Sequence, residues 1–164
     1  MEPISEELVE ETWQEVSEFS PQRGSSEVQK LGKEQPDLLA FMLEFSDDLE
    51  QDVKELAIYL FVVIHRMFRK AYGKPIKRLT AEVIMKGYEK NEKIILDLEG
   101  AHEKFYDRIA RVQLSEQPYI MKYVVESLFE MPDEEDPVAL TDDEIGIMFL
   151  LLKTVIDLFD EATD

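Results

Sequence analysis

Apolar residues recur at three- and four-residue steps in almost every segment of the chain, and this spacing constrains the fold most strongly. Near the start, Val9, Trp13 and Val16 fall on one helical face, after Ser5, a residue type suited to an N-cap. No segment alternates apolar and polar residues between hairpin turns, as strands would. The sequence therefore predicts an all-α fold, a single-domain helical bundle of about six to eight helices over residues 1–164.

The strongest apolar segment lies inside an expected helix at about 48–72. Ser46, just before this range, is its expected N-cap. Residues Leu56–Ile64 are apolar on all sides, so other helices should surround them. Gly73 suits the residue just after the helix. By composition, SPQRGSS at 20–26 is expected to be a loop, followed by a short helical turn around 27–31.

Other helices are expected where the sequence contains residues typical of a helix start. Pro36 and Pro118 suit the first turn of a helix, and Thr141 with Glu144 forms a T-x-x-E capping box. A further helix should run from Thr80 to about residue 98, with a bend or break at Gly87 or Asn91. An amphipathic segment is expected around 105–112, and a polar loop at 131–137.

Two parts of the chain resemble each other. Residues 34–44, EQPDLLAFMLE, align without gaps on 116–126, EQPYIMKYVVE. With a seven-residue lengthening of the second loop, residues 55–63 also align on 144–152. Each copy would be a proline-started helix followed by a long apolar helix, which predicts a duplication with repeat units 34–72 and 116–161. Two helical hairpins would then pack about a pseudo-two-fold axis, with the apolar helices in the centre. The alternative stays open that any two amphipathic helices align this well.

The chain is strongly acidic, with a formal net charge of −19. Residues 1–53 and 112–164 each carry a net charge of −12, whereas residues 54–111 carry +5. The hydrophobic content of 45% is too high for a disordered acidic chain, so the charge should lie on the outside of a folded protein. Such acidic faces suit docking on a basic partner, and they also serve solubility alone.

Several classes of protein are excluded or disfavoured. Without cysteine there is no disulfide, no thiolate zinc site and no cysteine nucleophile. The N-terminal residues lack the features of a secretory signal, and the longest apolar run is far shorter than the roughly 20 residues that cross a bilayer. We expect a soluble, cytoplasmic protein without a membrane partner. No nucleotide-binding or hydrolase motif with fixed spacing occurs.

One pattern of carboxylates suggests a metal site. Glu6-Glu7-x-x-Glu10 and Glu44-x-x-Asp47 resemble the EExxE and ExxD motifs of all-α nucleotide pyrophosphohydrolases of the MazG type. The resemblance implies that these carboxylates hold Mg²⁺ against a phosphate chain, and oxygen ligands suit that ion. Among 37 acidic residues such spacings also arise by chance.

The two histidines of the chain each suggest a candidate site. Asp97, Glu99 and His102 contain the Glu-x-x-His spacing of di-iron bundles, but only one copy of it, so an exposed charged turn is the alternative. His65 ends the apolar run and is either a buried histidine bonded to a neighbour or a residue facing a pocket between helices.

The basic middle of the chain contains a stretch with no acidic residue between its members. It consists of Arg66, Arg69, Lys70, Lys74, Lys77 and Arg78. The stretch is a candidate site for anions or nucleic acid, although the net charge of the chain disfavours nucleic acid. The favoured interpretation is that these residues neutralise the acidic flanks within the fold.

The leading hypothesis is therefore a non-catalytic protein-interaction module that docks through its acidic outer faces and needs no cofactor. The alternative is an Mg²⁺-dependent all-α phosphohydrolase, and a third hypothesis is anion or nucleic-acid binding through residues 66–78. The oligomeric state stays open.

Overall fold

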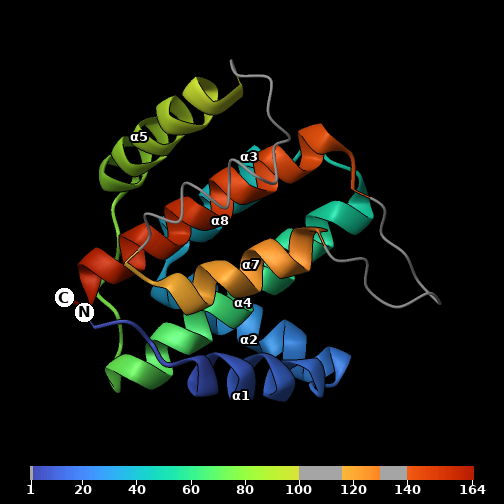
Figure 1. Ribbon diagram of the computed structural model, residues 1–164. Coiled ribbons are helices and arrows are strands. Elements are labelled where there is room, and N and C mark those ends of the chain that lie inside the picture. The colour runs from blue at the N-terminus through green and yellow to red at the C-terminus, as the bar shows by residue number, and fades with distance from the viewer. Residues whose placement is uncertain (1, 100–115, 130–139) are drawn as a thin grey trace.

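The computed structural model describes residues 2–99, 116–129 and 140–164, and every regular element in these ranges is a helix (Figure 1). The described helices are α1 (Glu6–Ser17), α2 (Pro21–Glu34), α3 (Pro36–Phe45), α4 (Gln51–Tyr72), α5 (Ala81–Glu99), α7 (Pro118–Phe129) and α8 (Asp142–Ala162). The predicted all-α helical bundle is confirmed. The expected segment at 105–112, the loop at 131–137 and His102 lie outside the described residues.

The two long apolar helices, α4 and α8, pack against each other in the middle of the bundle (Figure 1). Helices α1, α2 and α3 also contact α4, while α3, α5 and α7 contact α8. Phe61 on α4 and Phe149 and Phe159 on α8 are fully buried, and the core continues from them into every neighbouring helix. A helix that is apolar on all sides needs this enclosure, because any side left in water would forgo the free energy of burial.

Three helix ends predicted from the sequence are confirmed. Ser5 accepts a hydrogen bond from the Leu8 N–H and caps α1. The side chain of Thr141 and the carboxylate of Glu144 cap each other's backbone N–H groups at the start of α8. Gly73 ends α4 with a φ of 78°, a conformation that glycine adopts without steric cost.

Residues 20–26, expected to form a loop, are instead the first half of α2. Ser20 accepts a hydrogen bond from the Arg23 N–H, and Pro21 occupies the first helical turn, where its missing N–H is no loss. The composition of residues 20–26 is typical of a loop, although Ser20 and Pro21 form a capped helix start. The expected cap at Ser46 is also wrong: its hydroxyl donates to the Met42 carbonyl at the end of α3, and α4 begins only at Gln51.

Helix α5 is continuous from Ala81 to Glu99, so neither of the expected breaks occurs. Gly87 faces α8 instead, where a Cβ would lie 3.1 Å from Leu158 Cδ2. The glycine thus permits a close approach of α5 and α8.

Substituting Gly24 with alanine should stabilise the protein by about 1 kcal/mol, because glycine is a poor residue inside a helix. A Cβ on Gly24 meets no atom within 4 Å, so the new methyl group has room. The matched variant Gly73→Ala should destabilise, because its backbone has a positive φ. Urea unfolding measures both changes, and destabilisation by Gly24→Ala would contradict the helical assignment of residues 20–26.

A buried glutamine before α3 fixes the segment that leads into α5. Gln35 is fully buried. Its Oε1 accepts from the Leu79 N–H at 2.9 Å, and its Nε2 donates to the Lys77 carbonyl at 2.8 Å and the Ile76 carbonyl at 3.2 Å. Thr80 then caps the first turn of α5 by accepting from the Val83 N–H. Side-chain hydrogen bonds thus replace water on buried backbone groups.

Gln117, which precedes α7 in the second E-Q-P segment, makes matching contacts with the segment before α1. Its Oε1 accepts from the Ile4 N–H at 2.8 Å, and its Nε2 donates to the Glu2 carbonyl at 3.4 Å and to Asp160 Oδ1 at 2.8 Å. In both cases the side-chain oxygen accepts from the N–H of an apolar residue that directly precedes a helix cap. The side-chain nitrogen donates to the carbonyl of the residue two positions before that apolar residue. The duplication itself stays a prediction, which these contacts favour.

Candidate functional site

The carboxylates predicted to bind Mg²⁺ lie in two separate segments, and two of them pair with different lysines. Glu6, Glu7 and Glu10 are on α1, whereas Glu44 and Asp47 are at the end of α3 and just beyond it. Glu6 pairs with Lys122 of α7, and Asp47 pairs with Lys54 at the start of α4. In the ranges that the structure covers, no three His, Asp or Glu side chains form a group that could hold a metal ion. The alternative cluster of Asp97, Glu99 and His102 lies outside the described side chains.

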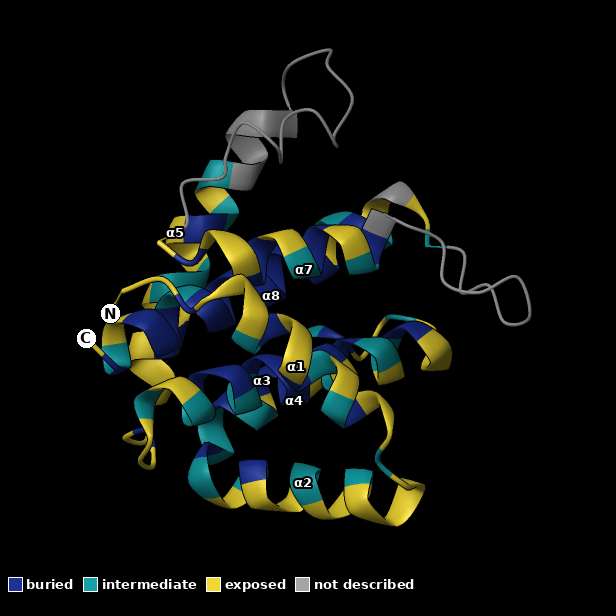
Figure 2. Ribbon diagram, turned by 60° about the horizontal axis from the view of Figure 1, so that its bottom comes forward, coloured by how far each residue is buried: buried dark blue, intermediate teal, exposed yellow. Residues whose placement is uncertain are grey.

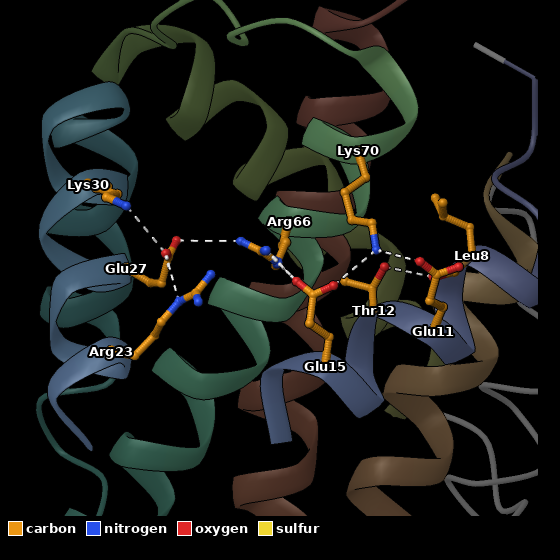
Figure 3. A network of polar contacts seen from close by, with 9 residues as sticks. All are labelled: Leu8, Glu11, Thr12, Glu15, Arg23, Glu27, Lys30, Arg66 and Lys70. Atoms are coloured by element: carbon orange, nitrogen blue, oxygen red, sulfur yellow. Dashed lines mark hydrogen bonds and ion pairs between the residues drawn. The ribbon is translucent and has the colours of Figure 1, made fainter. Parts of the chain in front are cut away.

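Four of the six residues of the basic stretch form ion pairs with acidic residues of the first third of the chain. Arg66 pairs with Glu15 and Glu27, and Lys70 with Glu11 and Glu15 (Figure 3). Further along the stretch, Arg69 pairs with Glu34 and Arg78 with Asp37. Neutralisation of an acidic flank is therefore what most of this stretch does.

Lys74 and Lys77 complete the basic stretch. Both are exposed, and neither makes an ion pair with a residue in the described ranges. The ammonium group of Lys74 lies 4.8 Å from the ring centroid of Tyr72.

The ion pairs form a chain of charges that joins α1, α2 and α4. Glu27 of α2 contacts Arg23 and Lys30 of its own helix as well as Arg66 of α4, and Glu15 of α1 contacts Arg66 from the other side (Figure 3). Burial alone would raise the pKa of Glu15, but Arg66 and Lys70 hold it below its ordinary value. These charges fix α2 next to α4, which apolar packing alone does weakly, since Leu31 is the only buried residue of α2.

A small polar pocket of about 130 Å³ lies between α2 and α4, and His65 is on its wall. His65 Nε2 is 3.4 Å from Glu34 Oε1 and makes no hydrogen bond with a described residue. Glu34 also accepts from the Ile76 N–H and contacts Arg69, and these partners lower its pKa although burial raises it. The structure thus has features of both interpretations of His65, because its Nε2 is buried beside Glu34 and its side chain also lines the pocket.

Stability should fall as the pH decreases from 7 to 5. Burial lowers the pKa of His65 below 6.5, against the effect of Glu34, so the unfolded chain binds more protons in this range. Below pH 4.5 a second loss should follow, because the lowered pKa values of Glu15 and Glu34 stabilise the folded chain only while both are ionised.

Urea unfolding at a series of pH values measures both losses. His65→Gln, which has no titrating group, should reduce the loss between pH 6.5 and 5 and retain the loss below pH 4.5. A wild-type stability that is constant or increases between pH 7 and 5 would contradict this assignment.

A larger groove, of about 680 Å³, lies between α2, α4 and the end of α1, and we call it the α2–α4 groove. On both α2 and α4, the residues that line the groove follow one another at three- and four-residue steps, so they lie on one face of each helix. Its lining residues are Val16, Phe19, Ser20, Pro21, Gly24, Ser25, Val28, Gln29, Glu55, Ile58, Tyr59 and Val62. Figure 2 shows α2 at the edge of the bundle, largely exposed along its length. The groove is therefore an unfilled space between helices with an apolar wall on α4.

The lining of the α2–α4 groove carries one carboxylate and is met by two arginines at Phe19. Among its described lining residues only Glu55 is charged. The guanidinium groups of Arg23 and Arg66 lie 4.4 and 5.2 Å from the ring centroid of Phe19, and both arginines pair with Glu27. Tyr59 is 37% exposed, and burial raises the pKa of its hydroxyl. An apolar surface on a chain with a net charge of −19 attracts a ligand that is both apolar and basic.

Sequence reasoning missed this groove because it treated residues 20–26 as a loop. A signal was present: Ser20 before Pro21 is a typical helix start, and Gly24, Val28 and Leu31 then follow with helical spacing. A helix there supplies a second wall opposite α4.

Comparison of the chain with protein-family models, with curated proteins and with solved structures finds no match. None of the helices in the described ranges combines the length and apolar character needed to span a membrane.

Proposed function

We propose that the chain is a non-catalytic, cytoplasmic protein-interaction module whose α2–α4 groove binds the apolar face of a basic helix from another protein. The observation that supports this most is the groove itself, a largely apolar space between helices with Glu55 in its lining. A helix laid in such a groove buries residues at i, i+3, i+4 and i+7 against matching faces. Helix α2 has 14 residues, a length of about 21 Å, so a partner segment of similar length fits beside it.

Charge complementarity selects a basic partner. The chain has a net charge of −19, and Glu55 lies in the lining of the groove. Lysines on the polar face of the partner helix would be attracted by Glu55 and by the net negative charge of the chain, and the association should weaken as salt screens the charges.

The other hypotheses have less support. For the Mg²⁺-dependent phosphohydrolase, Glu6 and Asp47 contact lysines on different helices instead of sharing a site. For anion or nucleic-acid binding, Arg66 and Arg69 already pair with carboxylates.

The proposal can be tested with designed peptides of the length of α2. The probe is a fluorescein-labelled leucine–lysine peptide with leucine at i, i+3, i+4 and i+7. Two control peptides are a leucine–glutamate version and a scrambled leucine–lysine version without an apolar face. Fluorescence anisotropy should show saturable binding of the probe, weaker binding at high salt, and little binding of either control.

A pair of variants places the binding in the groove. Gly24→Phe puts a ring into open space on the groove wall and should weaken binding of the probe about tenfold, a change of about 1.4 kcal/mol. The control Val83→Phe enlarges an exposed residue of α5 and should leave affinity unchanged. Equal binding of the scrambled peptide, or no effect of Gly24→Phe, would contradict the proposal.

A further inference from the structure

A second pocket, of about 190 Å³, lies between α1 and α7, and we call it the α1–α7 pocket. It shares no lining residue with the α2–α4 groove. Each of the two helices contributes residues at i, i+3, i+4 and i+7. They are Glu6, Val9, Glu10 and Trp13 from α1, and Tyr119, Lys122, Tyr123 and Glu126 from α7.

Aromatic rings form much of the apolar lining. Trp13 and Tyr123 are half-buried, and their rings are stacked, with centroids 6.5 Å apart and planes inclined by 14°. Val9 is buried in the lining, and Tyr119 is 40% exposed. The faces of such rings carry partial negative charge and attract cations. Burial raises the pKa of Tyr123, so its hydroxyl stays neutral at ordinary pH.

Carboxylates surround these rings. Glu6, Glu10 and Glu126 are exposed, and Lys122 is the only basic residue among the described residues of the lining. Its Nζ lies 3.2 Å from Glu6 Oε1, and Glu6 raises the pKa of Lys122, with a further contribution from Glu126. The surroundings therefore favour positive charge, and an ammonium group of the chain itself already lies at this pocket.

We propose that the α1–α7 pocket binds a methylated ammonium group, the chemistry of trimethyllysine and of choline. A quaternary ammonium carries its charge on an apolar surface, which suits a lining of both rings and carboxylates. A primary ammonium is strongly hydrated and gains less from the rings. The volume is smaller than the roughly 300 Å³ of the smallest drug-binding pockets, so it fits one end group.

The acidic border separates the two natural sources of this group. The phosphate of a phosphocholine headgroup would lie close to Glu6, Glu10 or Glu126 and be repelled. A trimethyllysine side chain carries no anion near its ammonium group. We therefore infer that the ligand is a methylated lysine rather than a lipid headgroup.

Trp13 is the only tryptophan of the chain, so its fluorescence reports on this pocket directly. At constant ionic strength, choline and N-acetyl-trimethyllysine amide should each produce a saturable change in emission. Neohexyl alcohol, the neutral carbon analogue of choline, and phosphocholine should produce a much smaller one. An equal response to neohexyl alcohol, a response to phosphocholine as strong as that to choline, or no saturable response to choline would overturn the proposal.

Variants of the border separate specific binding from a general effect of salt. Glu10→Gln should weaken binding of choline about tenfold, a change of about 1.4 kcal/mol. Tyr119→Ala, which removes one ring, should weaken it about threefold. Lys122→Met should strengthen binding, because it removes the competing ammonium.

A matched control is Glu44→Gln on α3, which removes a carboxylate outside the pocket and should leave affinity unchanged. Thermal unfolding first establishes that each variant is folded. Equal affinities of wild type, Glu10→Gln and Lys122→Met would overturn the proposal, and this result would leave peptide binding in the α2–α4 groove unaffected.

Discussion

Replacing Phe159 with alanine is expected to lower the free energy of unfolding by about 4 kcal/mol. Phe159 is fully buried on α8, and its ring centroid lies 6.4 Å from that of Phe61, 5.6 Å from that of Phe68 and 5.5 Å from that of His65. The substitution therefore opens a cavity between the two central helices, where the neighbouring rings cannot all move in to fill it. Urea unfolding followed by circular dichroism measures the change.

A matched control is Leu43→Ala on α3. Leu43 is 44% exposed, so the loss of its side chain should change the free energy of unfolding by no more than about 0.5 kcal/mol. Similar effects of the two substitutions would contradict the placement of α8 in the centre of the bundle.

Gln35→Leu is expected to lower the free energy of unfolding by about 3 kcal/mol. Leucine has a similar size but no amide, so the Leu79 N–H loses its acceptor and the Ile76 and Lys77 carbonyls lose a donor. Each unsatisfied buried group costs about 1–3 kcal/mol. At this chain length the loss corresponds to a decrease in Tm of about 6–12 °C.

The control for Gln35→Leu is Gln22→Leu, at an exposed position of α2. It should leave the stability nearly unchanged. Faster amide hydrogen exchange at Leu79 in Gln35→Leu, but not in Gln22→Leu, would locate the effect at the lost hydrogen bond. Equal stability of wild type and Gln35→Leu would show that this amide does not hold the segment before α5.

Much of the fold follows from the sequence because its signals are local. The start of α8 at Thr141 and the end of α4 at Gly73 depend on residues within one turn. The signal for the start of α2 is local as well. Ser20 and Pro21 also suit a turn, however, and the glycine and serines after them are poor helix formers. Contacts with α4, among them the ion pair between Glu27 and Arg66, favour the helix.

The sites follow from the sequence much less, because their members are far apart along the chain. Arg69 is 35 residues from Glu34 and Lys70 is 59 residues from Glu11, so their pairing is visible only in the fold. The α1–α7 pocket likewise combines Trp13 with Tyr123. Spacing rules describe one helix at a time, and a groove between helices depends on their relative positions.

The two E-Q-P segments show how a sequence observation gains a physical meaning. The identity of Gln35 and Gln117 was a feature of an alignment, and the structure shows both amides bonded to the segment before a capped helix. The glutamine bonds therefore give a reason for keeping these residues at both positions. A Gln117→Leu variant should consequently destabilise the protein by an amount similar to that of Gln35→Leu.

The most direct test of the central claim is to map where the leucine–lysine peptide binds by ¹H–¹⁵N and methyl NMR titration. The account predicts that the largest shifts occur at Phe19, Val28, Ile58 and Tyr59, the apolar and aromatic residues around the α2–α4 groove. Signals of Val83 and Met85 on α5 should stay unchanged. Shifts spread over all acidic faces, or concentrated away from α2 and α4, would contradict the account.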